Sequence, residues 1–188
     1  LENRVHIDLF DLPSDLDRFF SMREQYTCAI PVFHGKGGED GVVQGFLETL
    51  GIPYVFSQVE AHAIGMDKAM TKTILAAQGI KTADWVVLKV GDAYGWQYPV
   101  VVKPLDQGSS VGVCLVHRQE ELQKALVMAF SYSDRVLVER LIEGKEFTVA
   151  VVDHAGKSLS LPVIEIRSKN AFFDFESKYD PALCDELC

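Results

Sequence analysis

A glycine-rich segment, Gly35–Gly41, is the first part of the sequence whose residues suit binding chemistry. It follows an apolar run and precedes a helical pattern, so its backbone N–H groups and the helix N-terminus favour an anionic group. Asp40 replaces the third glycine of a dinucleotide fingerprint, and no Gly-Lys-Ser/Thr closes a Walker A motif. His34 could donate to an anion, and Glu39 could receive an ammonium or position a hydroxyl. A turn whose glutamate is favoured by the helix dipole explains these residues equally well.

Lys103 lies inside an apolar run of valines, and a second loop, Asp106–Gly112, follows it closely. A buried lysine is costly without an anionic partner, although a strand that turns Lys103 towards water is the simpler explanation of this residue alone. In the loop, glycines allow close approach of a ligand, and Ser109 and Ser110 add hydroxyls that can cradle phosphate. A flexible hairpin is the alternative. The lysine directly before the loop favours phosphate binding.

Two carboxylates and an aromatic run lie further along the chain. Glu139 and Glu146 flank Gly144, a spacing at which the two carboxylates can accept hydrogen bonds from an amino group and from ribose hydroxyls. Without further context a solvated turn is the better explanation. Phe172–Phe175 precedes Lys178-Tyr179, so these residues could form a purine sandwich with a phosphate contact, or a loop that fills the core.

The cysteines and histidines predict no metal site. Cys184 and Cys188 have a weak metal spacing, with no second pair to complete a tetrahedral site. Cys28 and Cys114 lie in apolar runs and are interpreted as buried free thiols of a reducing compartment. The histidines without metal-ligand spacing are interpreted as surface or structural residues: His6, His62, His117 and His154.

The composition is that of a globular protein with a real core. The chain has 188 residues, of which 48% are hydrophobic and 24% charged, which excludes disordered, collagen-like and coiled-coil classes. The formal charge of −9 argues against a nucleic acid or an anionic membrane as the partner. Apolar runs are too short to span a bilayer and no signal peptide is recognisable, so we expect a cytoplasmic protein. The start at Leu1 and the end at Cys188 suggest a segment of something longer.

Strand and helix patterns alternate along the chain. Apolar spacing predicts helices over 43–50, 66–77 and 122–130, with Gly51 and Gly79 closing the first two. Apolar runs predict the remaining elements as strands: Thr27–Phe33, Ile52–Phe56, Trp85–Val90, Pro99–Pro104, Gly112–Val116, Arg135–Glu139, Phe147–Val152 and Leu159–Ile166, the last two joined by a turn at Asp153–Gly156. The first part therefore reads as α/β and the part after about Ala83 as α+β with antiparallel pairing, with a boundary near Glu60–Met66.

Longer motifs run in a fixed order from Ile30 to Tyr179: His34–Gly41, Gln44-Gly45, Leu50–Tyr54, Met66–Lys68, Pro99–Pro104, Gly108–Gly112, Val138-Glu139, Gly144–Val149 and Phe172–Tyr179. Together they resemble the D-alanine–D-alanine ligase family of ATP-grasp enzymes, which serve peptidoglycan synthesis. The resemblance implies an α/β N-terminal lobe followed by α+β ATP-grasp lobes, built of antiparallel sheets with packed helices. It implies a partial N-terminal substrate-binding domain at 1–65, a central subdomain at 66–143 and the start of a C-terminal subdomain at 144–188.

The resemblance also assigns expected roles in nucleotide binding. Phosphate contacts would come from Lys68, Lys103 and Lys178, and Ser109 and Ser110 would form a mobile cover. Adenine would be held by Glu139 and the backbone of Arg140 to Ile142, with Phe172 packed on it, and Glu146 would take the ribose hydroxyls.

For catalysis, the resemblance implies that Glu39, Ser109 and Tyr179 form a hydrogen-bonded network over the site, with His34 near the substrate and the acyl phosphate. One D-alanine carboxylate would attack the γ-phosphate of ATP, and the amine of a second D-alanine would displace phosphate from the acyl phosphate. Lysines and Mg²⁺ would spread the developing charge in a closed, dry site.

Parts of the family pattern are missing from this sequence. The glutamate segment that holds the first substrate's ammonium has no match in Leu1–Gln25, and the metal-binding side chains would lie beyond Cys188. We therefore expect a fragment that is inactive alone. A ligase for D-Ala-D-Ser or D-Ala-D-lactate, and a truncated non-catalytic nucleotide-binding module, remain as alternatives. A homodimer and a bacterial, cell-wall-making source are consistent with the resemblance.

Overall fold

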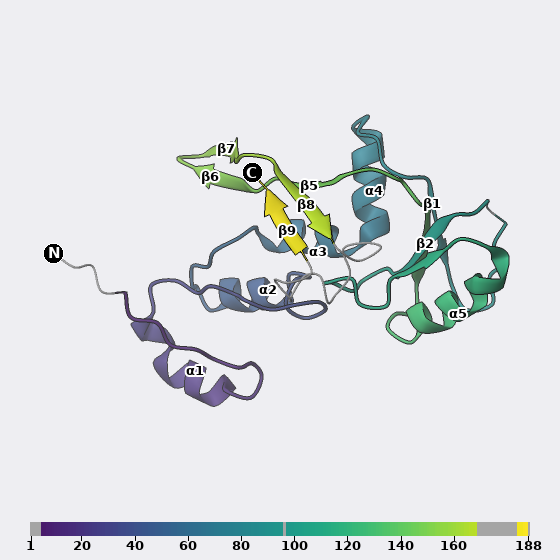
Figure 1. Ribbon diagram of the computed structural model, residues 1–188. Helices are drawn as coiled ribbons and strands as arrows, with labels where there is room; N and C mark the ends of the chain where they lie inside the picture. The colour runs from purple at the N-terminus through teal and green to yellow at the C-terminus, as the bar shows by residue number, and fades with distance from the viewer. Residues whose placement is uncertain (1–4, 96, 169–183, 188) are drawn as a thin grey trace.

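The computed structural model describes residues 5–95, 97–168 and 184–187, arranged as an N-terminal helical unit, a central sheet and a second group of strands (Figure 1). The α-helices are α1 (Leu16–Met22), α2 (Val42–Thr49), α3 (Val59–Met66), α4 (Lys68–Ala77) and α5 (Gln119–Phe130), and a 3₁₀ turn, Arg23–Gln25, follows α1. The strands are β1 (Trp85–Leu88), β2 (Val100–Pro104), β3 (Cys114–Val116), β4 (Val136–Arg140), β5 (Glu146–Thr148), β6 (Val151–His154), β7 (Lys157–Ser160), β8 (Ile164–Ser168) and β9 (Cys184–Leu187).

The central sheet has the strand order β1-β4-β2-β3, with every pair antiparallel. Its side chains alternate between two faces, as the two-residue period of a strand requires. On one face, Val100 and Val102 of β2 and Val136 and Val138 of β4 pack against Ala125 and Ala129 of α5, forming the main core. This confirms the expected antiparallel α+β arrangement of the later part of the chain.

The other face of this sheet carries the polar residues. Val101 and Lys103 of β2 lie between the core valines, and Glu139 of β4 stands directly opposite both Val101 and Trp85 in the strand register. Helix α4 lies on the side of the sheet away from α5 (Figure 1), and its Lys72 reaches Glu139. The strand alternation thus separates an apolar face, packed on α5, from a polar face that carries Lys103 and Glu139.

Helix α4 begins at Lys68, two residues after the predicted start at Met66, because Met66 is the last residue of helix α3. The Asp67 side chain accepts a hydrogen bond of 2.9 Å from the Met70 N–H, the usual role of an N-cap. The same carboxylate lies 3.1 Å from the guanidinium of Arg135, the residue before β4. Gly79, with φ +73°, follows the helix end in the left-handed region that favours glycine. The first residues of α4 are therefore fixed to the end of the central sheet.

The N-terminal unit has its own small core, formed by Phe19 of α1 with Leu47 and Ile52 from α2 and the segment after it. The strands predicted over 27–33 and 52–56 are wrong: the two segments share an isolated parallel bridge between Ala29 and Tyr54. Two alternate residues, Ile30 and Val32, are 62% and 77% exposed, so a continuous strand would gain no burial there. Cys28 is likewise exposed rather than buried, while Cys114 is half-buried against the main core.

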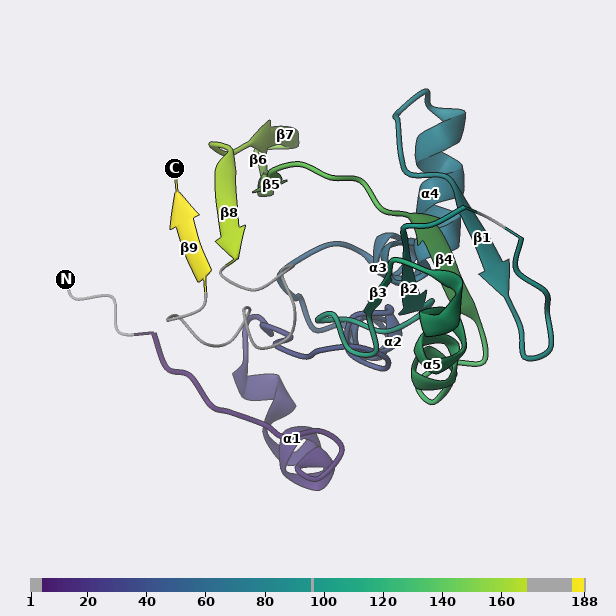
Figure 2. The same ribbon diagram turned by 45° about the vertical axis from the view of Figure 1, so that its right-hand side comes forward.

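The remaining strands form two groups, β5-β8-β9 and the β6-β7 hairpin, whose register pairs are all antiparallel. The predicted runs 147–152 and 159–166 are each divided into two strands, and the turn at 153–156 is confirmed by a 3.1 Å bond from the Gly156 N–H to Asp153. Figure 2 shows these strands standing apart from the central sheet, joined to β4 by an extended connection. None of the helices in the described ranges is long and apolar enough to cross a membrane.

Candidate functional site

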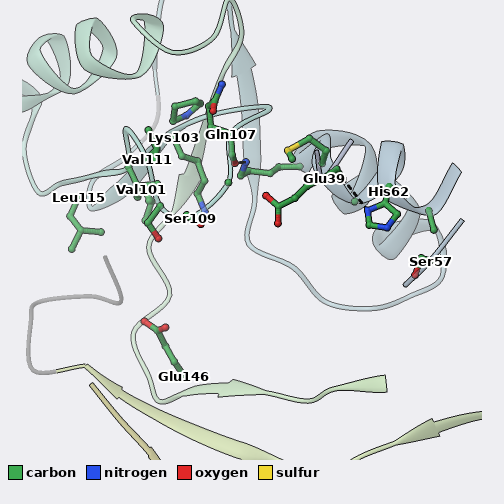
Figure 3. Close-up of a pocket in the computed structure, with 18 of the residues that line it drawn as sticks. Glu39, Ser57, His62, Val101, Lys103, Gln107, Ser109, Val111, Leu115 and Glu146 are labelled. Atoms are coloured by element: carbon green, nitrogen blue, oxygen red, sulfur yellow. Dashed lines mark hydrogen bonds between the residues drawn. The ribbon is translucent and has the colours of Figure 1, made fainter. Parts of the chain in front are cut away.

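A cavity of about 610 Å³ lies over the polar face of the central sheet (Figure 3). The sheet contributes Val101, Lys103 and Leu115, and the loop between β2 and β3 contributes Gln107 to Val111. On the opposite side the walls come from the N-terminal unit and from helices α3 and α4, with Glu39, His62 and Lys68 among them. Glu146 of β5 lines a further side, and in Figure 3 it lies apart from the other labelled residues with its carboxylate turned in their direction.

Lys68 is the first residue of α4, and its ammonium is partly buried in this cavity. Its Nζ donates to the carbonyl oxygens of Leu105 and Gln107, at 3.1 and 2.6 Å. Burial, assisted by the nearby charge of Lys103, lowers the pKa of Lys68 to about 8, although Asp106, Asp67 and Glu139 oppose the shift. An anion bound here would restore the charged form.

Lys103 and Lys72 share one carboxylate, that of Glu139. The Lys103 ammonium contacts Glu139 Oε1, and the Lys72 ammonium lies 2.7 Å from Oε2. Burial raises the pKa of Glu139, but the charges and hydrogen bonds of the two lysines outweigh burial and hold this pKa below its ordinary value. Glu139 is therefore an ionised acceptor beneath the cavity, and Lys103 has an anionic partner, as a lysine in an apolar strand requires.

The loop between β2 and β3 has an unusual backbone for its sequence. Ser109 and Ser110 both lie in the left-handed region, with φ of 49° and 58°, which costs roughly 1–2 kcal/mol for each L-residue. A Cβ on Gly108 would lie 2.6 Å from Glu39 Oε2, so only glycine fits here without displacing the carboxylate. The Gln107 side chain donates to the Tyr132 carbonyl oxygen at 3.1 Å, which anchors the start of the loop.

In the glycine-rich loop Gly35–Gly41, backbone N–H groups donate to acidic side chains of the same loop. The Gly35 N–H donates to Glu39 Oε2 at 2.5 Å, and the Gly37 N–H donates to Asp40 Oδ2 at 2.8 Å. These N–H groups therefore serve internal carboxylates, which favours the turn interpretation of this loop over an anion cradle. Glu39 nevertheless reaches the cavity, where it faces the second loop.

The structure brings together six of the residues singled out in the sequence: Glu39, Lys68, Lys103, Ser109, Ser110 and Glu146 all line the cavity. Glu139 joins them from below through Lys103. His34 and Ile142 are exposed and are not among the lining residues, and Arg140 lines a different cavity of about 420 Å³ with Asp84, Trp85 and Gln97. Phe172, Lys178 and Tyr179 lie outside the described residues.

Sequence reasoning missed three residues of this region. His62 was interpreted as surface or structural, but it lines the cavity, with Nδ1 3.2 Å from the Glu39 carbonyl oxygen. Gln107 also lines the cavity, and Lys72 holds Glu139. The available signal for Lys72 was its spacing, because residues four apart share one helix face with Lys68.

Across the residues that the structure describes, no group of three or more His, Cys, Asp or Glu side chains is placed to hold a metal ion. The described side chains thus do not assemble a magnesium site.

Comparison with known proteins agrees with the geometry. A family profile described as D-ala D-ala ligase C-terminus matches residues 62–186, and one described as D-ala D-ala ligase N-terminus matches residues 11–57. The D-alanine–D-alanine ligase of Geobacter sulfurreducens is 43% identical over 183 residues, which cover 95% of this chain and 55% of the relative. The chain thus spans about half the length of the curated relatives it matches.

Solved structures show the same similarity. A D-alanine–D-alanine ligase from Bacillus anthracis superposes with a TM-score of 0.75 at 38% identity, covering 93% of this chain and 58% of that protein. The same organism's enzyme complexed with ATP gives a TM-score of 0.72 at 34% identity, covering 93% and 56%. The fold is that of ATP-grasp ligases, and the chain belongs to the D-alanine–D-alanine ligase family.

Proposed function

We propose that this chain forms the nucleotide site and part of the substrate site of an enzyme that joins two D-alanines with ATP, for peptidoglycan synthesis. The observation that carries the proposal is a cavity lined by Lys68, Lys103, Glu146 and the loop Asp106–Gly112, here named the serine loop. Two ammonium groups beside backbone N–H groups and hydroxyls suit a polyphosphate, and a carboxylate at the other side suits ribose hydroxyls. Family membership and the ATP-complexed neighbour support the same assignment.

In this proposal, Lys68 and Lys103 neutralise the charge of the phosphates, and the Glu146 carboxylate accepts hydrogen bonds from the ribose hydroxyls. The Glu139 carboxylate and the backbone from Arg140 to Ile142 form hydrogen bonds with adenine. Glu139 is the last residue but one of β4, next to the point where the chain leaves the sheet. Phe172 and Lys178 complete the adenine and phosphate contacts. The serine loop, with Ser109 and Ser110, covers the phosphates and excludes water.

The proposed reaction has two steps, a phosphoryl transfer followed by an acyl transfer. A carboxylate oxygen of the first D-alanine bonds to the γ-phosphorus, and ADP leaves with the electron pair of the broken P–O bond. The amine of the second D-alanine then bonds to the acyl carbon, phosphate leaves, and the amine gives up a proton. Lysine charges stabilise the charge that develops on the transferring phosphoryl group. Glu39, Ser109, Tyr179 and His34 are proposed to hold the substrates.

The proposal also includes the domain limits 1–65, 66–143 and 144–188, Mg²⁺ as a cofactor held by residues other than those described, a cytoplasmic location and a homodimer. The charge of −9 supports a small-molecule substrate rather than nucleic acid.

The test is phosphate release from ATP by the native-length protein, measured with and without D-alanine. We expect release that depends on D-alanine and yields the dipeptide. D-Serine and D-lactate as acceptors separate this activity from the related ligases. A folded wild-type protein that binds ATP but releases no phosphate with any acceptor would favour a non-catalytic nucleotide-binding module.

A further inference from the structure

Lys72 is a buried lysine outside the cavity whose ammonium binds the same carboxylate as Lys103, that of Glu139. It is 8% exposed, on the face of α4 that meets the central sheet. Its Nζ lies 2.7 Å from Glu139 Oε2, donates to Thr82 Oγ1 at 2.6 Å and sits 5.3 Å from the centre of the Trp85 ring. An ammonium has three donors, so the two hydrogen bonds and the ring face use its capacity. Lys72 is thus built to hold Glu139 rather than to contact a ligand.

Glu139 is held from two sides by lysines with different surroundings. Lys103 lines the cavity and its side chain is 22% exposed, whereas the Lys72 side chain is 11% exposed and does not line the cavity. A polyphosphate entering the cavity would compete with Glu139 for Lys103, because both are anionic. Lys72 has no access to such a ligand and would keep its bond to Glu139. The carboxylate would then stay ionised and in place while Lys103 serves the phosphates.

The strand register explains why the contact with Lys72 matters for the orientation of the Glu139 carboxylate. Glu139 stands between Trp85 of β1 and Val101 of β2 on the polar face, next to the point where the chain leaves β4. A glutamate side chain with one bond fewer would be able to rotate about its own torsions, so its free lone pairs would lose a fixed direction. With Lys72 on Oε2, the lone pairs of Oε1 stay directed towards the cavity side, where Lys103 lies.

We propose that Lys72 is a positioning residue for nucleotide-base recognition: it holds the Glu139 carboxylate so that this group accepts a hydrogen bond from the exocyclic amino group of adenine after Lys103 has turned to the phosphates. The inference rests on the proposed function, in which Glu139 meets adenine. It gives Lys72 a role in selecting a 6-amino purine over a 6-oxo purine, whose oxygen would face the carboxylate as a second acceptor.

The test compares ATP with ITP as substrates and ligands of the native-length protein. Wild type should prefer ATP, and Lys72→Met should reduce the ATP-to-ITP ratio of affinities about tenfold or more, the size of a hydrogen bond to a charged group. The loss should lie in KM for ATP, with kcat changed far less. Lys72→Arg should keep most of the preference, and Lys81→Met, which removes an exposed lysine nearby, should not change it.

Two outcomes with the wild type and Lys72→Met overturn the proposal. One is a Lys72→Met protein that loses affinity for ATP and ITP equally, because that is what a structural role alone would do. The other is a wild type without any preference for ATP. If Lys72→Met fails to fold, the pair Glu139→Gln and Glu139→Gln/Lys72→Met replaces it, and the added Lys72 change should leave the ratio unaltered. A further fall in the ratio would overturn the role through Glu139. Binding measured by calorimetry keeps these results distinct from a failure to ligate D-alanine.

Discussion

The Lys68 ammonium donates a hydrogen bond of 2.6 Å to the carbonyl oxygen of Gln107, so the first turn of α4 holds the chain that enters the serine loop. Polar groups of the protein thus occupy the ammonium that is proposed to bind phosphate. The carbonyl oxygens of Leu105 and Gln107 use two of the three donors of this ammonium, so one N–H is left for a phosphate oxygen. A phosphate that binds Lys68 would therefore add to the contacts that hold the start of the serine loop.

Nucleotide binding should take up a proton near pH 8. The pKa of Lys68 is lowered to about 8, mainly by burial, so roughly half of the empty molecules lack this proton at pH 8. A bound triphosphate favours the charged form and raises the pKa again, so binding should take up about half a proton at pH 8 and almost none at pH 6.5. Calorimetry in two buffers of different ionisation enthalpy measures this uptake.

Lys68→Arg is the matched control, because arginine stays charged and should show no uptake from this position. Equal uptake in wild type and Lys68→Arg would assign the proton to another group.

The lowered pKa of Lys68 also predicts that the free energy of unfolding rises with pH. The unfolded lysine binds its proton more tightly, so this group's destabilisation is complete below pH 8 and is relieved as the pH rises from about 8 to 10.5.

Lys103→Met should weaken ATP binding about tenfold to hundredfold, as expected for the loss of a charge-assisted hydrogen bond to phosphate. Glu139 keeps its bond to Lys72 in this variant, so the fold should be retained. Equilibrium binding of ATP and of adenosine separates the effects, because adenosine lacks the phosphates and should bind nearly as it does to wild type. Lys89→Met, at an exposed position, is the control. Equal losses for ATP and adenosine would contradict a phosphate role.

Gly108→Ala should lower kcat about tenfold to hundredfold, the range for a small misplacement in a catalytic site. The new Cβ would meet Glu39 Oε2 at 2.6 Å and push the carboxylate off the Gly35 N–H. Steady-state ligation kinetics measure the effect, and Glu39→Asp, a shorter carboxylate, should restore part of the rate in the double variant. Gly95→Ala, where a Cβ meets nothing within 4 Å, should behave as wild type. Full activity in Gly108→Ala would show that the carboxylate can move freely.

Asp67→Ala should cost about 1–2 kcal/mol in the free energy of unfolding, because it removes the N-cap of α4 together with the ion pair to Arg135. Asp67→Asn keeps a capping oxygen and loses the charge, so its cost should be below about 1 kcal/mol. Urea unfolding of both variants gives the comparison. Equal costs for the two would mean that the ion pair, rather than the cap, carries the effect.

Much of the central sheet could be predicted from the sequence, because its strands and helices have strong local patterns. The Val100–Pro104 run is bounded by prolines, and α4 has a capping aspartate at its start and a glycine after its end. Helix α3 escaped prediction since none of its residues is buried and its apolar residues form no single face. It faces the cavity instead, which leaves no periodic signal.

The site was predicted in its types of residue more than in its contacts. The sequence placed Lys103 beside the serine loop, and the structure shows both lining one cavity. Which carboxylate meets which lysine depends on the strand register between β4 and β2 and on the rotation of α4 over the sheet. Neither follows from local spacing, so Lys72 and the carbonyl contacts of Lys68 became visible only in three dimensions.

The alternation of β2 has a consequence for how the gene can change. Buried valines at 100 and 102 face α5, while Val101 and Lys103 face the cavity. Inserting or deleting one residue within the strand would exchange the two faces, driving the lysine into the α5 core and the valines of that core towards the cavity. Relatives should therefore tolerate apolar replacements at position 101 while keeping the spacing between the proline that opens the strand and the serine loop constant.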